Sequence, residues 1–377
     1  MGYLSPAVDG AMNYRIPVYQ PDLSGNEKRY VMECLDSTWI SSKGKFIGEF
    51  ESRFAQYLDV KYAVTVCNGT LALHLALVTL GIGPGDEVIV PTLTYIASVN
   101  AIAYTGATPV FVDSLADTWQ MDPADVKRKI TPRTKGIMAV HLYGHPCEMD
   151  ALNALAQEHN IFLIEDCAEA FGTRYKETRV GGLGEMGIFS FYGNKTITTG
   201  EGGMVVTNDK TLYERSKHFK SQGLAAHREY WHDVMGYNYR MTNICAAIGL
   251  AQLERAEEFL AKKTALSNLY RSELADLPVE VHRQYGPATH SYWMISILVE
   301  NAVDRDPLRL HLAARGIETR PLFHPVHTMP MYASRYQRHP VAEDLSWRGL
   351  NLPSWPGLSS SQVAEVRAAL YDYYKRK

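Results

Sequence analysis

Apolar and polar positions alternate in blocks along most of the chain. From residue 62 onward, short apolar runs typical of buried strands take turns with longer segments that have helical periodicity. Strands separated by helices of this length predict βαβ units and a mainly parallel sheet. The predicted strands are 62–67, 86–91, 109–113, 136–142 and 161–166, and the predicted helices are 71–80, 95–104, 123–130 and 149–160.

The spacing becomes shorter after residue 186. Two apolar strands, 187–192 and 204–207, have only a loop between them, which predicts a hairpin-like, antiparallel region. The rest of the pattern is typical of a smaller α+β domain. It predicts a long helical stretch from 241 to about 274, a strand at 293–299, a helix at 307–315, a proline- and histidine-rich loop at 321–330 and a terminal helix from residue 360.

Domain boundaries follow from this change of pattern. We predict an N-terminal segment at 1–23, a large domain at 24–255 and a small C-terminal domain at 256–377. The segment Ser24–Glu27 has the form of a capping box, which predicts a helix that opens there and ends near Leu35. The start of the chain has neither basic residues nor a long apolar stretch, so we expect no signal peptide.

Composition narrows the class of protein. Apolar residues make up 46% and charged residues 21%, as in a soluble globular protein, and a net charge of −3 gives no electrostatic case for nucleic acid or membrane binding. No apolar stretch reaches the roughly 18 residues that suggest a membrane span. The five cysteines are odd in number and form no CxxC pair, so a reducing cytoplasm is favoured over a disulfide framework.

Two residues at the ends of successive predicted strands carry the strongest chemical signal. The apolar run 161–166 ends in Asp166, and the strand that follows delivers Lys195. Pyridoxal phosphate (PLP) chemistry needs a lysine amine that forms a Schiff base and a carboxylate that keeps the pyridine nitrogen protonated. Asp166 alone could equally be a helix cap or a turn residue. Together, the two residues predict a PLP site.

A phosphate cradle is predicted between the first of these strands and its helix. Gly69 permits close approach of the backbone, Thr70 adds a hydroxyl, and the free N–H groups of a helix N-terminus attract an anion. Ser190 could supply a second hydroxyl, although an ordinary strand-to-helix turn is the alternative. Tyr95, at the end of the next strand, is either a ring that stacks on a planar cofactor or a core tyrosine.

Three other patterns carry less weight. The GxGxxG run at 182–187 precedes a strand instead of following one, so it fails the structural test for a dinucleotide site. His141 and His145 have i,i+4 spacing on a strand and turn, not on a helix, which does not favour zinc. His324 and His327 lie in a stiff, proline-rich loop that could present them to a ligand, and two partly exposed surface histidines are the alternative.

The motifs occur in the order that is typical of a known family. From about Ile16 to its C-terminus, the chain resembles the DegT/DnrJ/EryC1/StrS nucleotide-sugar aminotransferases. The resemblance implies a PLP-dependent type I (aspartate aminotransferase-like) fold with a mainly parallel mixed sheet, and a homodimer with shared active sites. The motifs are Asn68–Thr70, Pro91–Tyr95, Glu165–Ala168, Ser190, Lys195, Thr199–Gly203 and Gly236–Arg240.

The resemblance also implies roles for residues at the cofactor. Lys195 would form the Schiff base, Asp166 would bind the pyridinium nitrogen and Tyr95 would stack on the ring. Many family members have glutamine or histidine where this chain has Glu169, opposite the hydroxyl of the cofactor. A carboxylate there has to be protonated or hydrogen-bonded elsewhere. The residues expected to hold the phosphate are Gly69, Thr70, Ser190 and, from the other subunit, Asn238.

Substrate recognition is implied in less detail. Within the family, segments 35–43, 191–200 and 319–331 are most similar to members that aminate GDP-4-keto-6-deoxymannose. The resemblance therefore predicts amino transfer from L-glutamate to this GDP-linked keto sugar, giving GDP-perosamine for O-antigen synthesis and 2-oxoglutarate. The residues expected at the sugar are His324 and His327, and the candidates for the glutamate carboxylate are Arg240 and Arg320.

Two rival functions stay open. The first is an aminotransferase for another keto sugar, carried by UDP or dTDP, because the residues that read the base cannot be located in the sequence. The second is a non-catalytic PLP-binding regulator, which would need a DNA-binding segment; neither a basic patch nor a spare helical module is visible. A related branch of the family has histidine in place of the lysine and dehydrates its sugar, and Lys195 argues against that branch.

Overall fold

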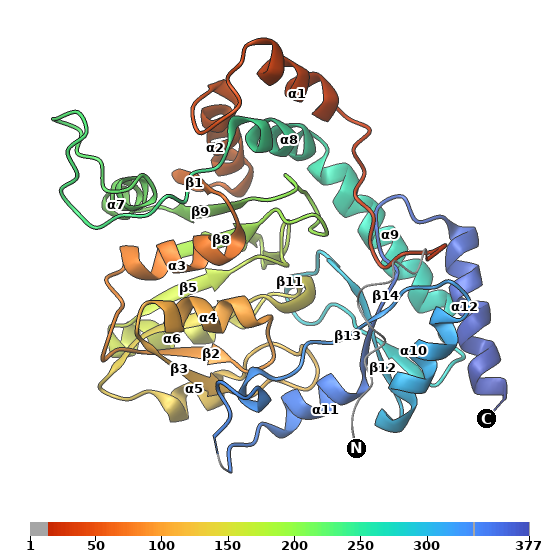
Figure 1. Ribbon diagram of the computed structural model, residues 1–377. Helices are drawn as coiled ribbons and strands as arrows, with labels where there is room; N and C mark the ends of the chain where they lie inside the picture. The colour runs from red at the N-terminus through yellow and green to blue at the C-terminus, as the bar shows by residue number, and fades with distance from the viewer. Residues whose placement is uncertain (1–13, 335, 377) are drawn as a thin grey trace.

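The computed structural model describes residues 14–334 and 336–376, which form two main sheets with helices packed around them (Figure 1). Of the predicted N-terminal segment, residues 1–13 lie outside the described part of the chain. Among the described residues, no helix combines the length and the apolar character needed to cross a membrane.

The larger sheet is mixed and mostly parallel. Its strands within the described residues are β1 (Tyr62–Val66), β2 (Glu87–Pro91), β3 (Thr108–Val112), β4 (Thr134–Val140), β5 (Phe162–Asp166), β8 (Met186–Ser190) and β9 (Gly203–Thr207). They lie in the order β1-β9-β8-β5-β4-β2-β3. The pairings from β8 to β3 are parallel, while β9 runs antiparallel to both β8 and β1. The predicted parallel sheet and its antiparallel hairpin are confirmed.

Helices cover both faces of this sheet (Figure 1). They are α1 (Glu27–Asp36), α2 (Lys45–Leu58), α3 (Gly69–Thr79), α4 (Ile96–Tyr104), α5 (Pro123–Lys129), α6 (Met149–His159), α7 (Lys210–Lys220) and α8 (Asn243–Glu254). The helices α3, α4 and α7 pack on the face that buries Val88 and Val90, and α5 and α6 pack on the face that buries Ile89. Since both faces are covered, these strands are apolar at nearly every position.

One helix of this layer, α2, was missed in the sequence. Phe46, Phe50, Phe54 and Leu58 are buried and recur at every fourth position. This spacing places their side chains on a single stripe, which packs against α8 and the β1–β9 part of the sheet. The apolar stripe was a usable signal for the helix. The mostly polar helix α7 was also missed.

A smaller antiparallel sheet follows in the chain and lies beside the larger one (Figure 1). Its strands are β10 (Val279–Val281), β12 (Ile295–Val299), β13 (Arg320–Pro321) and β14 (Gly349–Leu352), in the order β10-β12-β14-β13. The helices around it are α9 (Ala256–Glu273), α10 (Arg305–Ala313), α11 (Pro340–Arg348) and α12 (Ser360–Lys375). Short elements complete the fold: β6 (Arg174–Tyr175), β7 (Thr178–Arg179), β11 (Ala288–Thr289), η1 (Leu142–Gly144), η2 (Ala302–Asp304) and η3 (Val326–Thr328).

The long helical stretch predicted from 241 to 274 is two helices. The helix α8 ends at Glu254, and Arg255 interrupts the helical conformation before α9 begins. Its guanidinium donates to Asp22 and Glu258, so a partner distant in sequence fixes the break. Phe259 at the start of α9 packs in the core around α2, whereas Leu266 packs under the small sheet. The domain boundary at 255/256 stays a prediction.

The predicted capping box at Ser24 is wrong. Asn26 precedes α1 and makes no capping hydrogen bond with its side chain. The hydroxyl of Ser24 donates to Asp22, and the carboxylate of Glu27 accepts from Gln252 of α8 at 2.6 Å. Packing on α8 therefore overrides the local signal at the start of α1.

Candidate active site

Asp166 ends β5 at the carboxyl edge of the parallel strands, where α/β folds bind ligands. Its side chain is buried, and each oxygen accepts one hydrogen bond, from the Ser98 hydroxyl at 2.7 Å and the Ala168 N–H at 3.0 Å. Burial raises the pKa of Asp166, while these bonds and the charge of Lys195 oppose the rise. A cationic group beside it would hold it ionised.

Lys195 lies in the loop after β8 and is nearly buried. Its Nζ is 4.0 Å from the centroid of the Trp293 ring and 3.9 Å from Oε1 of Glu169. Burial lowers the pKa of Lys195, and the charges of Glu169 and Asp166 counteract this. The ammonium is therefore poised to lose a proton more readily than an exposed lysine.

Segments distant in sequence hold the backbone of this loop. The Tyr19 hydroxyl donates to the carbonyl of Lys195 at 2.6 Å, and the Trp293 indole donates to the carbonyl of Asn194 at 2.8 Å. Tyr143 stacks nearly parallel to the Trp293 ring, with centroids 6.1 Å apart. None of these three aromatic residues was predicted at the site, because no motif marks the contacts of Tyr19 and Trp293 with the loop or that of Tyr143 with Trp293.

Glu169 lies beside Lys195, and its second oxygen accepts from the backbone N–H of Tyr143 at 2.9 Å. Tyr143 has a φ of 54°, which is costly for a residue with a side chain, and its buried ring fixes it there. Burial, the largest effect, raises the pKa of Glu169 to about 7. The carboxyl is thus hydrogen-bonded and close to its midpoint at neutral pH.

The predicted phosphate cradle has the shape of one. Asn68 caps α3 by accepting the Leu71 N–H at 3.0 Å, and Gly69 is the first residue of the helix. A Cβ added to Gly69 would lie 2.7 Å from the Cβ of Ser190. The helix N-terminus and the Ser190 side chain therefore converge, with Thr70 next in the same turn. Converging N–H and hydroxyl donors at a helix N-terminus suit a phosphate.

We expect Gly69→Ala to weaken binding of PLP by about 10- to 100-fold, because the added methyl group would push Ser190 out of the cradle. Absorbance titration of the cofactor-free protein with PLP measures the change. Gly48→Ala is the control, since a Cβ there meets no atom within 4 Å. Wild-type affinity in the Gly69 variant would contradict the assignment of this cradle.

Tyr95 is the residue before α4 and is 57% exposed, which rules out the core alternative. The ring is 5.5 Å from that of Phe323, and α4 also carries Ser98, which holds Asp166. Ser98 was a missed site residue, although it lies one helical turn after Tyr95. The open face of Tyr95 on the Asp166 side of the sheet is consistent with its predicted stacking role.

Asn238 is exposed in the segment after α7. Arg240 donates to its side-chain oxygen at 3.0 Å, so the amide N–H groups of Asn238 are the ones available to an anion. The neighbouring Tyr239 carbonyl accepts from the backbone N–H of Cys67, just before the cradle. The role of Asn238 across a subunit interface, and that of Arg240 at a substrate carboxylate, stay predictions.

The substrate residues predicted in the C-terminal part lie in different settings. His327 is buried, with Nδ1 2.7 Å from the Thr92 hydroxyl and Nε2 3.3 Å from Glu343, so both ring nitrogens face protein groups. His324 is exposed, and Arg320 is exposed and paired with Glu318. Their contacts with a sugar or a carboxylate stay predictions.

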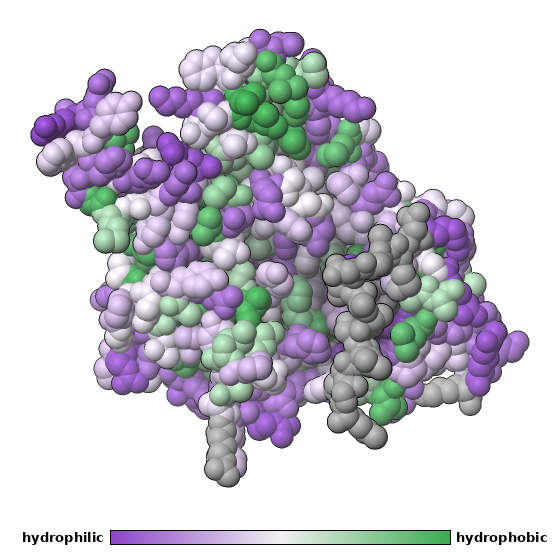
Figure 2. Space-filling model, viewed as in Figure 1, coloured by the Kyte–Doolittle hydropathy of each residue, from purple (hydrophilic) through white to green (hydrophobic). Residues whose placement is uncertain are grey.

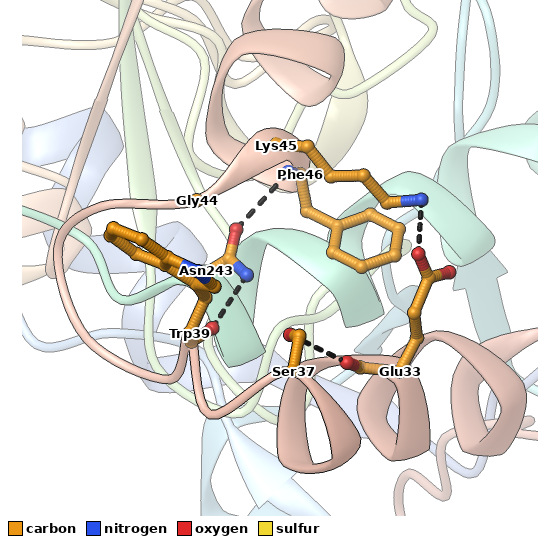
Figure 3. A pocket seen from close by; sticks show the side chains of 7 residues that line it. All are labelled: Glu33, Ser37, Trp39, Gly44, Lys45, Phe46 and Asn243. Carbon is orange, nitrogen blue, oxygen red and sulfur yellow. Dashed lines mark hydrogen bonds and ion pairs between the residues drawn. The ribbon is translucent and has the colours of Figure 1, made fainter.

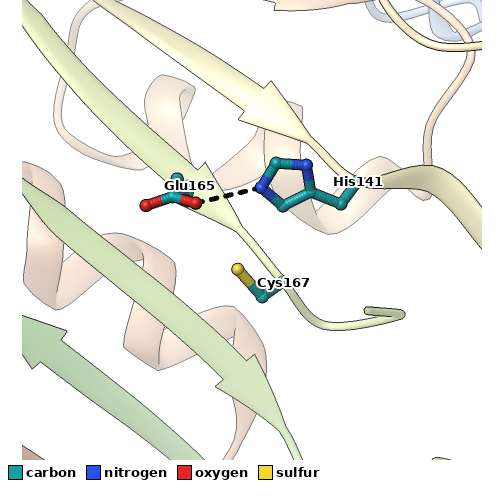
Figure 4. A group of neighbouring side chains, drawn as sticks. All are labelled: His141, Glu165 and Cys167. Carbon is teal, nitrogen blue, oxygen red and sulfur yellow. Dashed lines mark hydrogen bonds and ion pairs between the residues drawn. The ribbon is translucent and has the colours of Figure 1, made fainter. Parts of the chain in front are cut away.

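A second cluster, behind the sheet edge, consists of His141, Glu165 and Cys167, all buried (Figure 4). Their donor types and their proximity suit a metal ion, but the Glu165 carboxylate and the His141 ring are already hydrogen-bonded within the protein. Glu165 accepts from the backbone N–H of Gly181, Leu183 and Gly184 at 2.7–2.8 Å. The Cys147 N–H donates to Nδ1 of His141, which leaves Nε2 to donate to Glu165 at 3.2 Å. The glycine-rich run therefore encloses a carboxylate of its own chain.

We expect Glu165→Gln to destabilise the fold by about 3–5 kcal/mol, because the amide nitrogen would face backbone donors and leave them unpaired in the core. Urea unfolding followed by circular dichroism measures the loss. The exposed Glu158→Gln is the control. A change below about 1 kcal/mol would show that this network does not support the loop.

The sequence of the chain matches a known family. The sequence profile of the DegT/DnrJ/EryC1/StrS aminotransferases covers residues 21–371. The chain belongs to this family. GDP-perosamine synthase of Escherichia coli O157:H7 is 63% identical over 362 residues, which are 96% of this chain and 99% of that relative.

Two solved structures of such aminotransferases share the fold. DesV of Streptomyces venezuelae, in complex with a ketimine intermediate, matches with a TM-score of 0.88 and 38% identity over 93% of this chain and 95% of that one. The putative sugar aminotransferase Spr1654 from Streptococcus pneumoniae, in its PLP form, matches with a TM-score of 0.91 and 29% identity over 96% and 99%. The predicted type I fold is confirmed.

The residues present fit PLP, the cofactor of this aminotransferase family. Gly69 lets the helix N-terminus lie against the Ser190 side chain, where a Cβ would not fit, and Asp166 is a buried carboxylate held by Ser98 and the Ala168 N–H. Lys195 supplies the amine, beside Glu169 and close enough to Asp166 to feel its charge. The metal reading of the second cluster and the dinucleotide reading of the glycine run receive no such support.

Proposed function

We propose that this protein transfers the amino group of L-glutamate to C4 of GDP-4-keto-6-deoxymannose, giving GDP-perosamine and 2-oxoglutarate. The observation that carries the chemistry is the buried Lys195 amine placed between Glu169 and the Asp166 side of the sheet. The sugar is supported by the 63% identity to GDP-perosamine synthase over nearly the whole of both chains.

The chain's own residues account for each step. When bound, PLP supplies an aldehyde that carries the amino group and a cationic ring that withdraws electrons. Lys195 removes the α-proton of glutamate as general base and returns a proton as general acid, and it does the reverse at C4 of the sugar. Asp166 holds the proton on the ring nitrogen, and Ser98 keeps its carboxylate in place.

Binding and water exclusion fall to the surrounding groups. Gly69 and Ser190 hold the phosphate, and Thr70 adds its hydroxyl. Trp293 covers the Lys195 amine on one side, which keeps water away from the proton transfers. The amine can then exchange protons with the substrate instead of with solvent.

We also propose a homodimer with shared active sites. Exposed apolar side chains gather at the top of the molecule over α1 and the loop after it (Figure 2): Met32, Leu35 and Ile40. Beside them lies a cavity of about 390 Å³, in which Asn243 joins Trp39 to Phe46 (Figure 3). A surface of this kind is typical of a protein interface. Light scattering is expected to give twice the mass of the 42.3 kDa chain.

Mass spectrometry of the product tests the substrate. The purified protein, loaded with PLP and given L-glutamate, is expected to convert GDP-4-keto-6-deoxymannose to the amino sugar with a higher kcat/KM than the dTDP- and UDP-linked 4-keto sugars. A preference for another carrier would assign the protein to a different nucleotide sugar. Tight PLP binding without turnover of any keto sugar would support the non-catalytic reading instead.

A further inference from the structure

Lys195 and Glu169 form a buried pair that needs a function of its own. Their side chains lie 3.9 Å apart from Nζ to Oε1, with 14% and 5% of their surfaces exposed. Asp166 stands nearby, but both of its oxygens already accept hydrogen bonds. In Glu169 one oxygen accepts from the Tyr143 N–H, and the other faces the lysine.

Tyr143, whose backbone N–H binds Glu169, has a costly backbone conformation that fixes the position of the carboxylate. Tyr143 keeps a φ of 54° and thereby directs its N–H at Oε2. The Tyr143 ring is locked by stacking on Trp293 and Phe323, and its hydroxyl accepts from the Phe323 N–H at 2.9 Å. Because Oε2 is fixed, Oε1 stays directed at the amine.

Within residues 14–334 and 336–376, few charged groups face the pair. Lys195 and Asp166 face Glu169, together with the Tyr143 phenol, while Glu169 and Asp166 face Lys195. His141, the residue after β4, also faces Asp166. Burial opposes both the ammonium of Lys195 and the carboxylate of Glu169, so a neutral pair costs little more than a charged one.

We infer that Glu169 exchanges a proton with Lys195 between the two half-reactions, so that an uncharged amine faces the incoming substrate. In this step an N–H bond of the Lys195 ammonium breaks and an O–H bond forms on Oε1 of Glu169. One proton moves, the amine keeps its electron pair, and the two charges disappear together. The side chains approach from 3.9 Å to hydrogen-bond distance for the transfer. The inference rests on the proposed aminotransferase function but not on which sugar is aminated.

The electrostatic coupling between Glu169 and Lys195 can be measured in two forms of the full chain: the one without cofactor and the one loaded with pyridoxamine phosphate. Lys195 has a free amine in both. Glu169→Gln keeps the acceptor for the Tyr143 N–H and removes the charge and the acid. We expect this variant to label faster at Lys195 with an amine-reactive reagent, about tenfold at a fixed pH near 7, because the lysine pKa falls by about one unit. Peptide mass spectrometry locates the label.

The reciprocal variant is Lys195→Met. It removes the positive neighbour of Glu169, so the infrared carbonyl band of the protonated carboxyl is expected to persist to higher pH than in the wild-type chain. The same band is expected to be missing in Glu169→Gln. The exposed Glu201→Gln is the control for loss of one negative charge near the site.

The rate separates proton exchange from a merely structural role. In Glu169→Gln the form loaded with pyridoxamine phosphate is expected to react about 100-fold more slowly, in a single turnover, with the keto sugar that the wild type accepts. The Lys195 amine is more available in this variant, but no carboxyl is left beside it to take up and return its proton. Unchanged labelling and an unchanged carbonyl band would overturn the coupling. If Glu169→Gln labels faster at Lys195 but its single turnover is unchanged or faster, the proposed proton exchange is wrong. Both outcomes are independent of the sugar that the enzyme prefers.

Discussion

Lys195→Ala is expected to abolish amino transfer, lowering the single-turnover rate with glutamate by at least about 10⁴-fold. The side chain is both the covalent attachment point and the group that moves the proton, and Asp166 and Glu169 cannot replace it because they carry no amine. Stopped-flow absorbance of the PLP-loaded protein, followed by product analysis, measures the loss.

Two controls accompany this variant. Lys176→Ala removes an exposed lysine that pairs with Asp150, and it is expected to retain wild-type turnover. Borohydride treatment of the wild-type holoenzyme is expected to fix the cofactor on the peptide that contains Lys195. Cofactor fixed on another lysine, or glutamate turnover that survives in Lys195→Ala, would remove the basis of the proposed chemistry.

Asp166→Asn is expected to retain the fold and lose about 10³-fold in the same half-reaction. The amide has the shape of the carboxylate, and its one oxygen can still accept from the Ala168 N–H while the Ser98 hydroxyl turns to accept from the amide nitrogen, but it cannot keep a proton on the ring nitrogen. The ring would then withdraw electrons less strongly, and removal of the α-proton would become slow. Single-turnover kinetics and the absorbance of the bound cofactor report the two effects.

Ser98→Ala provides a graded comparison, because it removes one hydrogen bond from Asp166 and leaves the charge. We expect its loss to be roughly tenfold or less. Equal rates for Asp166→Asn and the wild type would show that another group protonates the ring. If Ser98→Ala lost as much rate as Asp166→Asn, the position of the Asp166 side chain, and not its charge, would be what the rate depends on.

The central sheet could be predicted because its strands are buried on both faces. The strand β5, for example, begins with three apolar residues and ends in Glu165 and Asp166, so its end at Asp166 could be placed within a residue. The boundary between α8 and α9 could not, since the contact of Arg255 with Asp22 interrupts a stretch that is locally suited to a helix. The capping box at the start of α1 was wrongly predicted for the same reason, because Glu27 contacts Gln252 of α8.

The same contrast holds in the site. Asp166, Lys195 and Gly69 were predicted because strand ends of one sheet meet at one edge, so sequence order implies proximity. Trp293 was not, because it reaches the lysine only after the smaller sheet has packed on the larger one. Tyr143 was not, because it contacts Glu169 and the Trp293 ring and not the lysine itself. The contact of Glu165 with the glycine-rich run was also hidden, since a backbone that binds a phosphate and one that binds an internal carboxylate use the same residue types.

The helix α9 limits where the chain can be divided into fragments. Its first turns place Ala256 and Phe259 in the core around α2, and its later turns support the small sheet. A fragment that stops at residue 255 would leave an open apolar cavity where the Phe259 side chain packs, and we expect it to aggregate when expressed alone. A split or circularly permuted variant has to keep α9 intact, and its new termini belong in the loops before or after this helix.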